Sequence, residues 1–433
     1  MTDPVFSGLQ PASVWAQFAT LCAVPRASKH EAALRERLVR WATERGLNAT
    51  VDAAGNLILR KPATVGYERA PGVVLQGHLD MVCQKNVDSA HDFSCDPIVP
   101  RLRDGWLVTE KTTLGADNGI GVALILAVLE DESIQHGPLE ALLTVDEEAG
   151  MGGARGLAPG VLQGRLMLNL DTEDWGEFYL GCAGGLDVNV VRPGVAVPAP
   201  ARQIARRISL GGLRGGHSGV DIHEERGNAI KLLVRVLREL EAEIPFRLAE
   251  LTGGTARNAL PREASAVVFV PEAAANRLGD MVSALAAKLK AELRGVDEGM
   301  VIDVAACKAD FVLSSAEQAV WLASLHAAPH GVHRMSRQVP GVVETSNNLG
   351  IVDLHPNGGA CNFMVRSLLE SGSLGLADEI GSLWALSGTA VDKEGFYPGW
   401  APNPDSALLK VCQAVYRRDF GAESEVKVVH AGL

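Results

Sequence analysis

Up to about residue 185, short apolar runs alternate with segments of helical pattern, and this alternation constrains the fold more than any other feature. The runs Val73–Gln76, Leu139–Val145 and Leu166–Leu170 predict strands, and Ala32–Arg45 and Asn118–Glu130 predict helices. Strands that alternate with helices indicate a layered α/β domain. In such sheets, functional side chains gather at the carboxyl ends of the strands. The residues that follow these runs are therefore the first candidates for a site.

Beyond Gly184 a Pro/Ala-rich stretch introduces a second series of predicted elements, which ends near Tyr397. Its predicted helices are Asn228–Glu243, Asp280–Arg294 and Ser315–Ala327, and its predicted strands are Arg206–Leu210, Ala266–Val270, Val301–Ala305, Gly341–Thr345 and Asn362–Val365. A further helix, Ser406–Arg418, and the run Val426–Val429 are expected to return to the first domain. The predicted organisation is a mixed-sheet α/β domain (1–185 and 398–433, the returning segment incomplete) with a smaller inserted α/β domain, 186–397.

Charge and cysteine content restrict the class of protein. A formal net charge of −12 argues against nucleic acid or an anionic membrane as the main partner. The seven cysteines are scattered and form no C-x-x-C pair, which is typical of a reducing compartment. No signal-peptide pattern opens the sequence, and the longest apolar stretch, Ile120–Leu129, is about half of the ~20 residues that span a bilayer. We therefore expect a cytoplasmic protein.

His78 and Asp80 follow the first of these strands and lie two residues apart, on one face of an extended segment. A neutral imidazole ligates zinc, and a neighbouring carboxylate orients the ring. The simpler interpretation is a structural hydrogen bond at the end of a strand.

Asp117 and Asp171 each follow a glycine loop or an apolar strand. Taken alone, Asp117 is better explained as a helix N-cap, and the simpler interpretation of Asp171 is a turn residue. A carboxylate at position 117 could instead bridge two cations, since its two oxygens accept independently.

Three consecutive acids, Asp146, Glu147 and Glu148, follow the strand at Leu139–Val145. Such a run is usually a solvated turn. The glycines behind it allow close backbone packing, so the acids could point inward, one glutamate binding metal and the other taking a proton from bound water. Together, one histidine and four acids at such positions suit a two-cation hydrolase.

At this point the sequence resembles the M20 family of di-zinc peptidases and deacylases, and among them the dipeptidases, over essentially the whole chain. The similar segments are Gly77-His-Leu-Asp80, Leu114-Gly-Ala-Asp117-Asn-Gly-Ile-Gly, Asp146-Glu-Glu-Ala-Gly-Met-Gly-Gly, Asn169-Leu-Asp171 and Gly181-Cys-Ala-Gly-Gly185. The resemblance implies a di-metal catalytic domain with an inserted lid domain, and two divalent ions, zinc or else manganese or cobalt.

The resemblance also implies the role of each residue. His78 and Asp171 would hold one metal and Glu148 the other, with Asp117 bridging them. Asp80 would orient His78. Glu147 would be the general base that activates a metal-bridged hydroxide and later protonates the leaving amine.

Three residues of the second domain are expected to contact substrate. His217 lies in a glycine-rich loop, and the resemblance implies that it stabilises the oxyanion, often from a partner subunit of a lid-mediated homodimer. Asn258 resembles a substrate-contacting asparagine of the family. Arg366 follows a predicted strand and could pair with the free carboxylate of a dipeptide. A flexible loop, a turn and a surface salt bridge are the respective simpler interpretations.

The expected function is metal-dependent hydrolysis of dipeptides, Xaa-His and others, with small peptides as partners. An N-acyl-amino-acid deacylase or a tripeptidase on the same fold is the alternative, as is an impaired form that only binds metal or peptide. The family's last metal ligand, a histidine near the C-terminus, has no counterpart, and His430 does not match it by position. We therefore expect the chain to be truncated.

Overall fold

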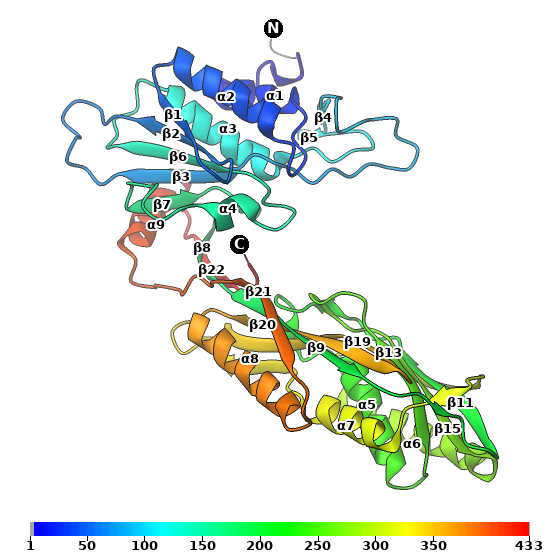
Figure 1. The fold of residues 1–433 in the computed structure, drawn as a ribbon. Coiled ribbons are helices and arrows are strands. Elements are labelled where there is room, and N and C mark those ends of the chain that lie inside the picture. Colours follow the sequence, from blue (N-terminus) through cyan, green and yellow to red (C-terminus); the bar gives the residue numbers. More distant parts are fainter. Residues whose placement is uncertain (1–3, 433) are drawn as a thin grey trace. The chain divides into compact units, whose positions relative to one another are not determined.

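A computed structural model describes residues 4–432, which form two compact units that divide between Trp175 and Gly176 (Figure 1). The predicted domain limits at 185 and 397 stay a prediction. Residues 398–432 lie within the second compact unit.

The first unit is built on a five-stranded mixed sheet of order β1-β2-β6-β3-β7. Strands β1, β2 and β6 pair antiparallel, whereas β6, β3 and β7 run parallel. Its elements are the 3-10 helix η1 (Pro4–Phe6), the helices α1 (Ala12–Cys22), α2 (Ala32–Glu44), α3 (Ala116–Glu130) and α4 (Gly152–Gly156), the sheet strands β1 (Asn48–Val51), β2 (Leu57–Lys61), β3 (Val73–His78), β6 (Leu139–Thr144) and β7 (Leu166–Asn169), and the separate hairpin β4 (Arg101–Arg103) and β5 (Trp106–Val108).

Helices α1, α2 and α3 cover one face of this sheet (Figure 1). Successive side chains of a strand point to opposite faces, so Leu57 and Leu59 of β2 join the core beneath these helices. Ile58 points the other way and packs with Val74 and Leu142 against the segment 157–162. Both faces are thus buried, which explains the nearly continuous apolar runs in the sequence.

The second unit contains a larger antiparallel sheet of order β16-β11-β15-β13-β19-β20-β9-β21, with β18 paired to β19. The strands of this sheet are β9 (Gly184–Pro193), β11 (Gln203–Gly211), β13 (Arg247–Gly253), β15 (Ala264–Pro271), β16 (Val301–Ala306), β18 (Gly331–Met335), β19 (Val343–His355), β20 (Gly358–Ser367) and β21 (Val391–Tyr397). The strand pairs outside it are β8 (Glu177–Cys182) with β22 (Glu425–Val429), β10 (Val197–Pro198) with β17 (Phe311–Val312), and β12 (Gly216–His217) with β14 (Ala259–Leu260).

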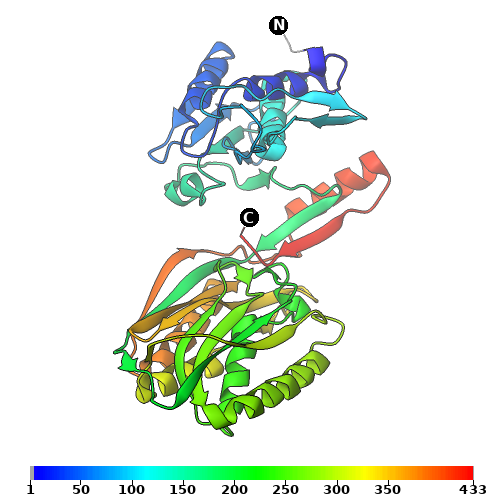
Figure 2. The ribbon, with the colours of Figure 1, turned by 90° about the vertical axis from the view of Figure 1, so that its right-hand side faces the viewer.

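Helices cover one face of this sheet (Figures 1 and 2). They are α5 (Ala229–Glu241), α6 (Ala275–Glu292), α7 (Ser315–Ala327) and α8 (Glu370–Ala385); the unit also contains the 3-10 helices η2 (Ile222–Glu224) and η3 (Glu272–Ala274) and the helix α9 (Ala407–Phe420). Trp321 of α7 and Trp384 of α8 meet edge to face at 5.1 Å in the core. The core therefore holds the helical layer against the sheet.

The predicted fold class, a mixed-sheet α/β domain with a second α/β domain, is confirmed. The three strands and two helices predicted before residue 185 are present, and the helix predicted at Ser315–Ala327 has these bounds. Helices α1 and α8 and the strand β13 were not predicted. Among the described residues, no helix combines the length and hydrophobicity that a membrane crossing requires.

Candidate functional site

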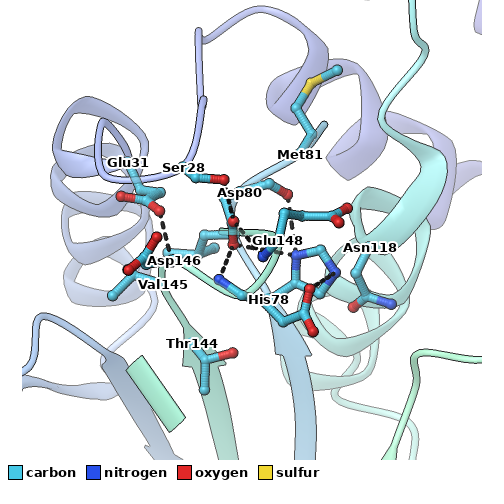
Figure 3. A network of polar contacts seen from close by, with 12 residues as sticks. Ser28, Glu31, His78, Asp80, Met81, Asn118, Thr144, Val145, Asp146 and Glu148 are labelled. Atoms are coloured by element: carbon cyan, nitrogen blue, oxygen red, sulfur yellow. Dashed lines mark hydrogen bonds and ion pairs between the residues drawn. The ribbon is translucent and has the colours of Figure 1, made fainter. Parts of the chain in front are cut away.

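His78 ends β3, and several carboxylates of the first unit converge on its ring (Figure 3). Its Nε2 lies 2.9 Å from Asp117 Oδ1, 3.6 Å from Asp171 Oδ1 and 3.9 Å from Glu147 Oε2. The ring is almost completely buried, so it is held in a fixed position among these acids. The structure therefore brings together residues from β3, the start of α3 and the ends of β6 and β7.

Asp80 lies on the other side of the ring and is fully buried. One of its oxygens is 3.3 Å from His78 Nδ1, as expected for a residue that orients the imidazole. Asp80 also accepts hydrogen bonds from Ser28 Oγ at 2.7 Å and from the backbone N–H groups of Glu147 and Glu148 at 3.1 Å. Burial alone would raise the pKa of Asp80, but these hydrogen bonds lower it to about 2. The carboxylate thus links β3 to the acidic turn.

The acidic turn after β6 depends on glycines. A Cβ on Gly152 would lie 2.3 Å from Asp146 Oδ2, and one on Gly153 would lie 2.5 Å from the carbonyl oxygen of Val145. Asp146 itself has a left-handed φ of +54°. Its N–H donates to Glu31 Oε1 at 2.8 Å, which fixes the turn to the start of α2. The expected close packing of the glycines behind the acids is present.

The loop before α3 is held by Arg26, a buried residue that the sequence analysis missed. The Arg26 guanidinium donates to the carbonyls of Leu79 and Asp80, at 2.9 and 2.7 Å, and to that of Gly115. Gly115 has φ +70°, and a Cβ there would lie 2.5 Å from the guanidinium. Arg26 thereby joins the end of β3 to the loop that presents Asp117. No local pattern marks it in the sequence.

Asp117 has non-helical backbone angles although it falls within the bounds of α3, so it is not a simple helix residue. The next residue, Asn118, donates through Nδ2 to Asp171 Oδ1 at 2.7 Å and to the Leu170 carbonyl at 2.6 Å. This amide therefore positions the carboxylate of Asp171. Asn118 follows Asp117 directly in the sequence, but it was not predicted as a site residue.

The protonation behaviour of this cluster reflects its excess of acids. Burial by itself would lower the pKa of His78, but contacts with Asp117, Asp171 and Asp80 raise it to about 12. The pKa of Asp117 is lowered, chiefly by its hydrogen bond with His78. A buried ring that holds a proton this tightly lies in a strongly negative field, which would equally attract a metal cation.

Burial also raises the pKa of Glu147, to about 7, with a further contribution from the neighbouring Asp171 and Glu148 carboxylates. Burial is also the main cause that raises the pKa of Glu148, and the charge of Asp117 raises it further. A carboxyl group with a pKa near neutrality can both accept and return a proton at working pH.

Ligand atoms of His78, Asp117 and Glu148 all lie within 4.8 Å of one another. One imidazole nitrogen with carboxylate oxygens is a donor set that suits zinc and similar divalent ions. Asp171, whose Oδ1 is 3.6 Å from His78 Nε2, is close enough to complete the set. The residues thus fit a divalent metal centre.

The second unit gathers a different group of polar residues. The N–H groups of Gly219 and Val220 donate to His217 Nδ1 at 3.2 and 3.1 Å. Since Nδ1 accepts, Nε2 carries the proton and is the donor nitrogen of the neutral ring. Burial lowers the pKa of His217, and the charge of Arg366 lowers it further. His217 is thus a neutral hydrogen-bond donor rather than a cation.

Arg366 is 4% exposed and donates to Tyr397 Oη at 2.9 Å and to Ser218 Oγ at 3.4 Å. Among the described residues it forms no ion pair with a carboxylate, so the simpler interpretation, a surface salt bridge, is wrong. Near it, buried His430 is 2.7 Å through Nε2 from Ser346 Oγ. Burial lowers the pKa of His430 to about 3, and Arg366 contributes. A buried, uncompensated guanidinium is suited to an anionic ligand.

Asn258 is exposed, and its carbonyl accepts the N–H of Ser218 at 2.8 Å. The loop that carries it is fixed by buried Asn348, whose Nδ2 donates to the carbonyls of Arg257 and Ala259. His217, Arg366 and Asn258 therefore belong to connected segments of one unit, with the Asn258 side chain free to reach a ligand.

Comparisons with known proteins identify relatives of this chain. The chain is 44% identical to the cytosol non-specific dipeptidase of Escherichia coli K12 over 99% of this chain and 88% of that protein. The crystal structure of the aminoacylhistidine dipeptidase from Vibrio alginolyticus matches with a TM-score of 0.93 and 44% identity, covering 99% of this chain and 88% of that one. An aminopeptidase of Bacillus cereus, 17% identical with a TM-score of 0.51, covering 97% of this chain and 84% of its own, shares the fold.

The family model for the M20 peptidase dimerisation domain matches residues 208–297, within the second unit. The alignments cover 99% of this chain and 88% of each relative, and the expected truncation at the C-terminus stays a prediction. An identity of 44% over 99% of this chain establishes that the chain and these dipeptidases belong to one family. The chain belongs to the M20 family of peptidases.

Proposed function

We propose that the protein is a metal-dependent dipeptidase. The observation that carries this proposal is the convergence of His78, Asp117 and Glu148 within 4.8 Å, beside a glutamate whose pKa is raised to about 7. The names of its relatives, a cytosol non-specific dipeptidase and an aminoacylhistidine dipeptidase, support the substrate class.

In this proposal two divalent ions bind in the first unit, zinc or else manganese or cobalt. His78 and Asp171 would hold one ion, Glu148 would hold the other, and Asp117 would contribute to both. When bound, such ions lower the pKa of water and polarise a carbonyl. The negative field that raises the pKa of His78 to about 12 supports cation binding here.

Glu147 is the general base. Its raised pKa lets it take a proton from the attacking water at neutral pH and return it to the leaving amine. Asp80 keeps the imidazole of His78 in place and, through the backbone N–H groups of Glu147 and Glu148, keeps the acidic turn in register.

His217, Asn258 and Arg366 bind substrate. His217 offers Nε2–H to the oxyanion that develops on the scissile carbonyl, a role supported by its neutral state. Arg366 pairs with the free carboxylate of the peptide, and Asn258 contacts the peptide. A carboxylate recognised at a fixed distance from the reacting bond selects dipeptides over longer chains.

Turnover of three related substrates tests the assignment. We expect zinc- or manganese-supported hydrolysis of Ala-His, with much slower hydrolysis of Ala-Ala-His and of N-acetylhistidine. Faster cleavage of Ala-Ala-His would identify a tripeptidase, and faster cleavage of N-acetylhistidine a deacylase. We further propose that the protein acts in the cytoplasm as a homodimer formed through the second unit, in which the dimerisation-domain match lies.

A further inference from the structure

A cavity of about 480 Å³ lies in the first unit, behind the acidic turn. Its charged lining residues are Lys29, Glu31, Arg35 and Asp146, and Gly152 and Gly153 also line it. None of the proposed metal ligands lines it. The cavity is therefore distinct from the centre around His78.

One of the two acids of this cavity, Asp146, has a carboxylate oxygen without a partner among the described residues. Glu31 is only 4% exposed, and its Oε1 accepts the backbone N–H groups of Lys29 at 3.0 Å and of Asp146 at 2.8 Å. The Oδ1 atom of Asp146 is buried and has no hydrogen-bond partner among the described residues. Figure 3 shows the Glu31 and Asp146 carboxylates next to each other. A buried carboxylate oxygen without a partner is costly, so Asp146 favours a cationic hydrogen-bond donor in this cavity.

Two basic residues, Lys29 and Arg35, line the same cavity. Within the described residues, neither Lys29 nor Arg35 forms an ion pair with Glu31 or Asp146. Arg35 donates through Nη1 to the carbonyl of Gly55 at 2.9 Å, which leaves its remaining N–H groups available. A guanidinium and an ammonium on one cavity wall are suited to a carboxylate.

We propose that this cavity is a second binding site, for a small zwitterion that carries one ammonium and one carboxylate group. Glu31 and Asp146 receive the ammonium, and Lys29 and Arg35 receive the carboxylate. An α-amino acid and a dipeptide share this chemistry. Their choice as ligands rests on the proposed function, because that reaction consumes one and releases the other.

The site is mechanically linked to the acidic turn. Glu31 holds the N–H of Asp146, and the next two N–H groups, of Glu147 and Glu148, bind Asp80. A ligand that bridges Glu31 and Asp146 therefore restrains the segment that presents the proposed general base. Occupancy should change kcat, whereas a product bound at the catalytic centre would raise KM.

Equilibrium dialysis of the full chain in EDTA tests the proposal, since no dipeptide turns over without metal. The probes are radiolabelled L-alanine and Ala-Ala, with L-lactate and ethylamine as analogues that lack one charge. We expect saturable binding of L-alanine, Ala-Ala or both, at one site per chain, and at least about tenfold weaker binding of either analogue. Arg35→Gln and Glu31→Gln should each weaken binding by about tenfold.

Arg37→Gln is the matched control, because Arg37 is exposed on the same helix and does not line the cavity. It should bind as the parent does, and circular dichroism establishes that each variant is folded. The proposal is overturned if no probe binds, if L-lactate binds as tightly as L-alanine, or if Arg35→Gln binds as the parent does. Hydrolysis of Ala-His by the same preparation with zinc is scored separately, so a failed peptidase assay leaves the binding result intact.

Discussion

His78 in the first unit and His217 and His430 in the second unit have pKa values shifted in opposite directions. In the first, acids raise the pKa of His78 to about 12. In the second, burial lowers the pKa of His430 to about 3 and also lowers that of His217, and Arg366 contributes to both. The first group attracts cations, and the second attracts anions. In the proposed function, the first group binds metal ions and the second binds the carboxylate of the peptide.

Among substitutions in the acidic group around His78, we expect the largest loss of activity from Glu147→Gln. This change keeps the shape of the side chain but removes its ability to take a proton. We expect kcat for Ala-His to fall by on the order of 10³-fold. Zinc content, measured by atomic absorption, should stay near that of the parent. Glu36→Gln, an exposed change on α2, should leave kcat unaltered, and comparable losses in both variants would contradict the assignment.

In the second unit, Arg366→Lys keeps the positive charge but loses the coplanar N–H donors of the guanidinium. We expect kcat/KM for Ala-His to fall by about tenfold to hundredfold, because hydrogen bonds between charged groups contribute about 1.5–3 kcal/mol. The amide of Ala-His, which lacks the carboxylate, should show almost no further loss in this variant. Equal losses for both substrates would argue against carboxylate recognition. Arg235→Lys, at a surface pair with Glu292, is the control.

Zinc binding by the acidic group around His78 should depend on pH. His78, with its pKa near 12, is protonated in the metal-free centre at neutral pH, so a metal ion must displace that proton. Zinc affinity should therefore rise by about tenfold per pH unit between about pH 6 and 8 for each proton displaced. Titration calorimetry in two buffers of different ionisation enthalpy measures the released protons. An affinity independent of pH would count against this centre.

Glu147 gives the metal-free chain a second pH signature. Its folded-state pKa of about 7 exceeds its ordinary value of 4.5, so protonation favours the folded state. The stability that it contributes is complete below pH 4.5 and is lost as pH rises through about 7. Thermal unfolding in EDTA should show this loss for the parent but not for Glu147→Gln. A loss of the same size in the variant would assign the effect to another group.

The smallest expected effect comes from Ser28→Ala. Ser28 donates a hydrogen bond to Asp80, and Asp80 orients the His78 imidazole. The change therefore makes the imidazole less firmly oriented but removes no proposed metal ligand. We expect about fivefold weaker zinc binding, equivalent to roughly 1 kcal/mol. Ser133→Ala, on an exposed turn, serves as the control, and zinc affinity should be the same as in the parent.

The sequence was sufficient to predict the residues that follow apolar strands. His78, Asp117, Glu148 and Asp171 all follow such runs or the glycine loop before α3, and the structure brings them together. The supporting residues could not be predicted, because they act across long separations. Ser28 lies 52 residues before Asp80, and Glu31 lies 115 residues before its partner Asp146.

The fold shows a similar limit. Strand β19 extends from Val343 to His355, well beyond the strand predicted at Gly341–Thr345. Its middle contains Ser346, Asn347 and Asn348, which are buried although polar, so the apolar pattern breaks where the strand continues. Their side chains hydrogen-bond to His430 and to backbone carbonyls, partners that only the folded chain supplies.

The most direct test of the account is hydrolysis of Ala-His by the mass-verified 433-residue chain, measured with zinc or manganese and again after EDTA treatment. We predict turnover that requires metal, disappears with EDTA and returns when metal is restored. Absence of turnover under every metal condition, from a folded preparation that binds zinc, would contradict it.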